Sequence, residues 1–367
     1  MIPRFLLSFV LALAAGGLPL TSQPLRNPRI ALSVHEFGLL MKSLSEPEGY
    51  FDSDNFVSNE AAYLKILPAV RRLGVNGGVY LGVGPDQNYS YIAEIQPELA
   101  ILIDVRKQNA LQHLYCKALF QRSANRAQYL ERLFGRKIRR KPTDITLAGI
   151  SDLLSLIDGA PRDASFRHQV IAEACQTIQS WNLGLDNSDL DAIRFIGEAF
   201  MAAGPDLKFT SYNRAPRSHH PTYRSLLQET DWMGVQSSFL AHEQRFTVVK
   251  TLFRENRIVP IVGDLGGSVA LRRTAEELRR RNLRVECFYV SNVEFYLFGG
   301  KRWPLYVQNI RQLPWAPNGV IIRSYANRWQ PHPAQIPGYY MISLLQQVRN
   351  FLENEASWKR DWNTYAP

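Results

Sequence analysis

Residues 78–109 decide the fold, and they read GVYLGVGPDQNYSYIAEIQPELAILIDVRKQN. A short apolar strand is predicted at 79–81, followed by a glycine loop at 82–88 and a helix over 89–95. The next run, 99–103, is continuously apolar, as a parallel strand covered on both faces requires. It ends at Asp104, and a helix follows over about 108–120. This strand–loop–helix–strand unit predicts an α/β fold with a Rossmann-like, mostly parallel sheet.

The glycine loop is the first candidate site. Glycine lets a ligand approach the backbone closely at the end of a strand, and it permits the tight turn. Asp104 follows Gly84 by 20 residues, the spacing at which an acid after the second strand binds ribose hydroxyls. The predicted cofactor-binding residues of this unit are Gly82, Gly84, Asp86, Gln87, Asn88 and Asp104. The residues alone also allow a simpler interpretation, a turn with a capping aspartate.

The α/β rhythm is interrupted and then resumes. Helices are predicted over 127–134, 146–157, 165–180, 188–201 and 239–255, and strands over 257–262, 285–290 and 319–322. Further helices are predicted over 61–67, with a kink at Pro68, and over 269–281, 303–312 and 338–355. The predicted organisation is a signal peptide or membrane anchor (1–22), a linker and helix (23–54), two halves of the Rossmann-like domain (55–121 and 256–367) and a helical insertion (122–255).

The later strand ends supply the next candidates, because ligands of open α/β sheets bind outside the carboxyl ends of the strands. Asp264 follows the strand at 257–262 and is a predicted cofactor residue. Asn292 and Glu294 follow the strand at 285–290 and are the predicted catalytic residues. Asn59 and Glu60, ahead of the first strand, are predicted to contact substrate, and a helix cap is the alternative.

Histidines and cysteines give no metal site. His219 and Tyr223 are predicted to form part of a basic lip for an anionic substrate. Adjacent histidines on an extended loop point in opposite directions, and His242-Glu243 lacks the second histidine of a zinc helix motif. The three cysteines include no C-x-x-C pair and are expected to pack as small apolar side chains.

The charge and the N-terminus bear on partners and location. A formal net charge of +10 and a pI of about 9.5 favour acidic partners, such as nucleic acid, anionic lipid or a phosphorylated substrate. No nucleic-acid-binding motif accompanies the charge, and solvated helix faces are the simpler explanation. The apolar run at 5–20 after Arg4 is typical of a secretory signal or membrane attachment. An exported or membrane-attached protein is expected, or a cytoplasmic one if this run is a buried helix.

The segment Leu81-Gly82-Val83-Gly84, with Asp104 after an apolar strand, resembles class I S-adenosylmethionine-dependent methyltransferases across residues 56–120 and 256–325. The resemblance implies that the glycine loop lies under the methionine part of the cofactor. It implies further that Asp104 holds the ribose, Asp264 lies near the adenine, and Asn292 and Glu294 face the methyl acceptor. The chain also resembles an uncharacterised bacterial family that shares the Ser-Asn-Glu, Gly-x-Gly-Pro-Asp-Gln-Asn, Val-Gly-Asp and Ser-Asn-Val-Glu segments.

The sequence therefore predicts a methyltransferase-like protein that binds S-adenosylmethionine and takes a small-molecule or lipid-like substrate. It departs from the family at Tyr80, where an acid is usual, in the missing third glycine, and after Asn292, where no proline follows. One alternative is an exported binding protein that keeps the fold without the reaction. A second is an NAD-type oxidoreductase, which would need a glycine in place of Gln87.

Overall fold

The chain forms one sheet, in which the first three strands lie on one side and the last three on the other. The computed structural model describes residues 31–139, 143–212, 217–326 and 332–353. Its six strands lie in the order β3-β2-β1-β4-β5-β6. The strands are β1 (Val79–Val83), β2 (Leu99–Asp104), β3 (Ile258–Val262), β4 (Val285–Ser291), β5 (Trp315–Ala326) and β6 (Met341–Gln347). The first five pair in parallel, and β6 is antiparallel to β5. The order reverses between β1 and β4, where such sheets bind ligands.

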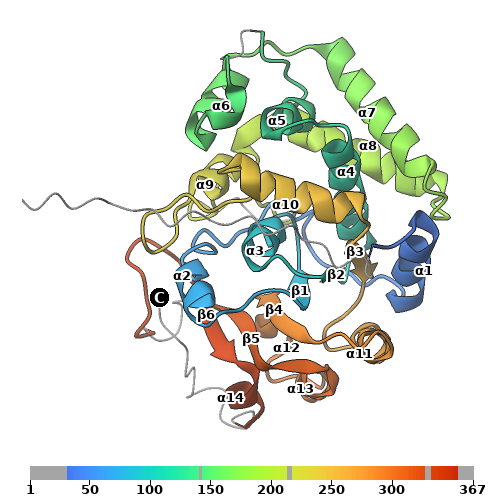
Figure 1. Cartoon of the computed structure of the whole chain (residues 1–367), viewed down its shortest axis with the longest axis vertical. Helices are drawn as coiled ribbons and strands as arrows, with labels where there is room; N and C mark the ends of the chain where they lie inside the picture. Colours follow the sequence, from blue (N-terminus) through green and yellow to red (C-terminus); the bar gives the residue numbers. More distant parts are fainter. Residues whose placement is uncertain (1–30, 140–142, 213–216, 327–331, 354–367) are drawn as a thin grey trace, which may run out of the picture.

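Helices cover both faces of the sheet, so its central strands are apolar throughout. Every residue of β1, β2 and β3 is buried. On one face lie α3 (Asn88–Ile95), α4 (Lys107–Gln121) and α10 (Glu243–Arg254), and on the other lie α11 (Ala270–Arg280), α13 (Arg302–Gln312) and α14 (Val348–Glu353) (Figure 1). The predicted α/β fold with a mostly parallel sheet is confirmed, and its strand order is consistent with a Rossmann-like fold.

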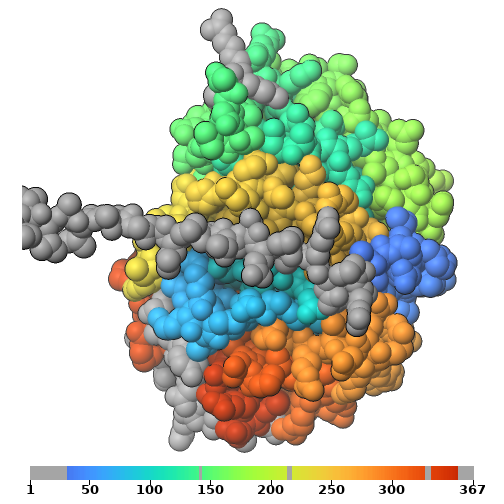
Figure 2. Space-filling model, in the orientation of Figure 1, coloured from blue at the N-terminus to red at the C-terminus, as the bar shows by residue number. Residues whose placement is uncertain are grey.

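The chain between β2 and β3 adds a helical layer outside α4. It contains α5 (Arg126–Phe134), α6 (Ile150–Asp158), α7 (Ala164–Gln179), α8 (Asn187–Ala203) and α9 (Tyr223–Gln228), with single 3₁₀ turns at Ile145–Leu147 and Gly204–Asp206. Figure 2 shows this layer in green to yellow on the opposite side of the molecule from the orange and red elements. Phe120 on α4 stacks on Phe246 of α10 and packs against Tyr129 of α5. Aromatic contacts therefore join this layer to the core of the sheet domain.

Two helix predictions were wrong. The helix expected over 338–355 is the strand β6 followed by the short α14, because residues 341–346 are all buried and pair with β5 along its length. The helix expected over 61–67 begins later, as α2 (Leu67–Arg72). Pro68 lies in its first turn, where the missing N–H costs no hydrogen bond, and does not kink it.

The N-terminal helix α1 (Val34–Leu44) packs against β3 and α11 at the edge of the sheet. None of the helices in the described ranges is long and apolar enough to cross a membrane. The run at 5–20, on which the signal prediction rests, lies outside those ranges. All three cysteines are buried, as predicted, and none of them is in a disulfide within the described ranges.

Candidate functional site

The loops that follow β1, β2, β3 and β4 surround a cavity of about 240 Å³ at the point where the strand order reverses. This volume is close to the lower end of the range for small-molecule sites, roughly 300–1,000 Å³. Six of the predicted site residues line it: Asn59, Gly84, Gln87, Asp104, Asp264 and Asn292. The cavity therefore brings together residues from all four strand ends and from the segment ahead of β1.

Residues 45–60, which we call the roof, run past the ends of β3 and β2 and form part of the cavity wall. Hydrogen bonds attach the roof to the ends of β3 and β2 and to α4. The Glu46 amide donates to the Val262 carbonyl at 3.0 Å, and the Gly49 amide donates to the Val105 carbonyl at 2.8 Å. Further along, Gln112 Nε2 donates to the Phe56 carbonyl at 2.7 Å. The roof contributes Tyr50, Phe51, Asn55, Ser58 and Asn59 to the cavity wall. Of these, only Asn59 was predicted from the sequence.

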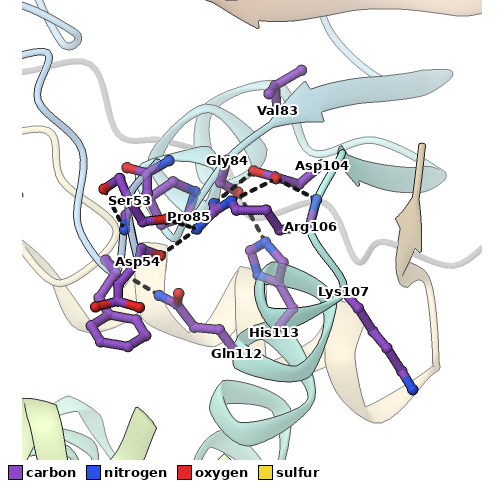
Figure 3. A network of polar contacts seen from close by, with 12 residues as sticks. Ser53, Asp54, Val83, Gly84, Pro85, Asp104, Arg106, Lys107, Gln112 and His113 are labelled. Carbon is purple, nitrogen blue, oxygen red and sulfur yellow. Dashed lines mark hydrogen bonds and ion pairs between the residues drawn. The ribbon is translucent and has the colours of Figure 1, made fainter. Parts of the chain in front are cut away.

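Gly84 forms the turn of the glycine loop. Its φ of +83° lies in the region that favours glycine. Its carbonyl accepts a hydrogen bond from His113 Nε2 at 3.0 Å, as Figure 3 shows. Gly82 has a different role, because it lies within β1 and does not line the cavity. A Cβ atom at Gly82 would overlap the side chains of Asn88 and Tyr80. Packing therefore explains this glycine.

Asn88 and Asp86 support the loop from behind and do not line the cavity. Asn88 Nδ2 donates to the carbonyls of Val83, Gly84 and Pro85, and its Oδ1 accepts from the Tyr80 hydroxyl at 2.7 Å. Asp86 accepts a hydrogen bond from the hydroxyl of Tyr223 on α9. Burial raises the pKa of Asp86 to about 7. Three predicted ligand-binding residues, Asp86, Asn88 and Tyr223, thus hold the loop in place.

Gln87 has a buried acceptor without a hydrogen-bond partner beside the cavity. Its side chain is 5% exposed and lines the cavity. Nε2 lies 3.4 Å from the Tyr289 hydroxyl, whereas Oε1 has no hydrogen-bond partner among the described residues. An unsatisfied buried acceptor costs about 1–3 kcal/mol. Oε1 presents almost no surface to the cavity, so the Gln87 amide would have to rotate before a ligand N–H or O–H group removes that cost.

Asp104, the predicted ribose-binding acid, is paired with Arg106 (Figure 3). Arg106 Nε lies 3.1 Å from Asp104 Oδ1, and its NH2 group lies 3.0 Å from Oδ2. The NH1 group of Arg106 donates to the roof carbonyls of Ser53 and Asp54. Arg106 was not predicted as a site residue. It lines the cavity and fastens the roof to the end of β2.

Asp264 lies near the cavity mouth and is also paired with an arginine. Its Oδ2 lies 3.0 Å from the NH1 group of Arg302, a side chain that is 64% exposed. Asp264 Oδ1 accepts from the Gly266 amide at 2.9 Å. Exposed Tyr50 and Tyr296 also line this part of the cavity. The mouth thus combines an ion pair with aromatic side chains.

Of the two predicted catalytic residues after β4, one lines the cavity and the other does not. Asn292 lines the cavity, next to Ser291, which has a φ of +53°. Glu294 does not line it: Glu294 Oε2 lies 2.8 Å from Arg323 Nε, and both side chains are 1% exposed. Glu294 Oε1 accepts from the Tyr306 hydroxyl at 2.9 Å. Glu294 therefore forms a buried ion pair that connects the short helix α12 (Glu294–Leu297), which follows β4, to β5.

Two further predicted substrate residues lie outside the cavity lining. Glu60 accepts hydrogen bonds from the hydroxyls of Ser291 and Ser324, and burial raises its pKa. It ties the roof to the ends of β4 and β5. His219 is exposed, and its ring lies 4.2 Å from that of Tyr340. In the part of the chain that the structure describes, no group of three His, Cys, Asp or Glu side chains could hold a metal ion.

Fold and site together define an α/β protein with a ligand-sized cavity at the switch point of a mostly parallel sheet. The chain belongs to the family described as a domain of unknown function (DUF7790), whose family model matches residues 55–364. No curated protein matches the chain. The matched region includes all six strands and most of the cavity wall.

Proposed function

We propose that the cavity binds S-adenosylmethionine and that the protein is methyltransferase-like, with a small-molecule or lipid-like acceptor. One observation carries the proposal. Gly84, Asp104, Asp264 and Asn292, which the resemblance assigns to cofactor and acceptor from four separate strand ends, line a single cavity. A cluster of this kind at the switch point is the expected position of a ligand in an open α/β sheet.

The charges in the cavity favour the same cofactor over NAD. The charged residues that line it, within the described ranges, are two Asp–Arg pairs, Asp104 with Arg106 and Asp264 with Arg302. Both arginines are already paired, so neither is left to balance a pyrophosphate. S-adenosylmethionine contains no phosphate. The volume of about 240 Å³ also suits the smaller cofactor better than a dinucleotide.

Each lining residue has a defined task in this proposal. Gly84 lets the ligand approach the backbone, Gln87 Oε1 accepts a hydrogen bond from it, and Asp104 accepts from a ribose hydroxyl. Asn292 and Asn59 orient the acceptor with their side-chain amides. Bound S-adenosylmethionine supplies an electrophilic methyl group, and its transfer requires mainly that the acceptor atom be aligned with that group.

A second candidate function is ligand binding without turnover. It is favoured by the position of Glu294, which is fully engaged with Arg323 and Tyr306 and cannot serve as a base in the cavity. The acids that do line the cavity, Asp104 and Asp264, are both in ion pairs. Transfer of a radiolabelled methyl group into a lipid or small-molecule extract would support catalysis. Binding without transfer would support the second candidate.

Calorimetry with the whole chain tests the shared part of both candidates. S-adenosylmethionine and S-adenosylhomocysteine are expected to bind, and NAD is not. Asp104→Asn should weaken binding by about tenfold or more, since a hydrogen bond to a charged group contributes about 1.5–3 kcal/mol. Asp206→Asn, a change on the surface where Asp206 pairs with Arg224, is the matched control and should leave binding unchanged. Failure of both sulfur compounds to bind would overturn the proposal.

A further inference from the structure

Asp104 has fewer free acceptor positions than a carboxylate normally offers to a ribose. An ionised carboxylate can accept about four hydrogen bonds. Asp104 Oδ1 already accepts from the Arg106 amide at 3.0 Å and from Arg106 Nε at 3.1 Å. Oδ2 accepts from the NH2 group of Arg106 at 3.0 Å. No other group in the described ranges donates to Asp104, so one acceptor position remains there, and it is on Oδ2.

Arg106 fills the other acceptor positions of Asp104. A guanidinium has five N–H donors. Nε and NH2 each donate to Asp104, and NH1 donates to the carbonyls of Ser53 and Asp54. The remaining N–H belongs to NH2 and, in the planar guanidinium, points about 120° away from the N–H that bonds Oδ2. A group bound at the free position of Oδ2 therefore accepts no well-aligned hydrogen bond from it. Both residues line the cavity.

We propose that Asp104 binds one hydroxyl group of the ligand, and that Arg106, which occupies the other acceptor positions of the carboxylate, is thereby a specificity-determining residue. The hydroxyl donates to the free acceptor position of Asp104 Oδ2. The inference rests on the proposed function and narrows it. Of the two ribose hydroxyls of the cofactor, one is recognised at this position and the other is not.

The fold keeps Arg106 in place, so that a ribose diol does not displace it. Its side chain is buried, its guanidinium lies over the Phe51 ring at 5.7 Å, and it holds two roof carbonyls. Moving it would leave a buried cation and the Ser53 and Asp54 carbonyls without partners. Breaking such a buried pair is strongly unfavourable. The second ribose hydroxyl must therefore find water or another group.

Binding of two deoxy analogues to the unmodified protein tests the inference. S-adenosylhomocysteine is titrated beside its 2′-deoxy and 3′-deoxy forms. Loss of one hydroxyl should weaken binding by about tenfold or more, because the lost hydrogen bond is to a charged pair, and loss of the other by less than about threefold. The inference is overturned if both losses weaken binding about equally, or if neither does. No binding of S-adenosylhomocysteine itself would instead overturn the proposed function.

Arg106→Lys adds a test of the residue. A lysine ammonium cannot form the two parallel hydrogen bonds of a guanidinium, so it frees acceptor positions on Asp104. The difference between the two deoxy analogues should then shrink to less than about threefold. Arg224→Lys, on the surface beside Asp158 and Asp206, should preserve the difference. An unchanged difference in a folded Arg106→Lys protein would show that Arg106 does not set the preference. If this variant does not fold, the comparison in the unmodified protein decides.

Discussion

Replacing Asp86 by asparagine should change how stability depends on pH. Asp86 is buried under the glycine loop, where its carboxyl accepts a hydrogen bond from Tyr223 and has no salt bridge within the described ranges. Burial raises its pKa from 3.8 to about 7. Between about pH 4 and pH 7 the folded protein therefore holds a proton that the unfolded chain has released.

The size of the effect follows from this difference. A raised carboxyl pKa contributes stability that is fully present below the unfolded value and is lost as pH rises through the folded one. A difference of about three pKa units corresponds to roughly 4 kcal/mol of unfolding free energy, lost between about pH 4 and pH 7. Asparagine has the shape of the protonated acid and cannot ionise, so Asp86→Asn should not show this loss.

Urea unfolding of the unmodified protein and of Asp86→Asn, at about pH 5 and about pH 8, measures this loss of unfolding free energy. From the lower to the higher pH, the variant should gain about 3 kcal/mol relative to the unmodified protein. Taking this difference cancels the titration of other groups, including Glu60, whose pKa is also raised by burial. Tyr223→Phe removes the donor that lowers the pKa of Asp86, so the loss should extend to higher pH and be larger at about pH 8. Parallel stability profiles for Asp86→Asn and the unmodified protein would refute the reasoning.

Three other substitutions test separate parts of the site. Gly84→Ala forces a side chain onto a φ of +83°, so calorimetry should show a lower Tm, from a cost of about 1–2 kcal/mol, and weaker S-adenosylhomocysteine binding. Glu294→Gln leaves Arg323 buried without its carboxylate, so urea unfolding should show a loss of about 3–5 kcal/mol while the folded protein keeps its ligand affinity. Burial lowers the pKa of His113 to about 4, so stability should fall as pH drops from about 6.5 towards 4. Thermal unfolding of His113→Gln should lack that acid-side fall, and an unchanged fall would assign it to other groups.

Most strands were predictable because burial on both faces leaves a local signal. The runs in β1, β2 and β3 are short, apolar and bounded by glycine, proline or charge, and each begins and ends within a residue or two of its prediction. The strand β6 lacks that signal, since Met-Ile-Ser-Leu-Leu-Gln-Gln suits a helix as well as a strand. Its pairing with β5 decides the outcome, and a contact between distant segments does not appear in local sequence.

For the site, strand ends were a good guide to position and a poor guide to side-chain direction. Gly84, Asp104 and Asn292 line the cavity, as the rule about carboxyl ends of strands predicts. Glu294 is only two residues beyond Asn292, yet it pairs with Arg323 on the next strand. Glu60 follows Asn59 directly and turns towards Ser324. Spacing along the chain places a residue near the cavity, but the partner that its side chain finds depends on residues far away in the sequence.

The partners of arginine side chains also depend on distant parts of the chain, which explains why Arg106 was not predicted as a site residue. The composition suggests a basic surface, but several arginines are buried and act as cross-links between distant backbone segments. Arg126 donates to the carbonyls of Leu240 and Ala241, and Arg257 donates to those of Pro97 and Glu98. Arg106 does the same with the roof carbonyls, which lie more than 50 residues earlier in the chain. Its position beside Asp104 is therefore set by the fold before any ligand binds, which is the condition that a single-hydroxyl site requires.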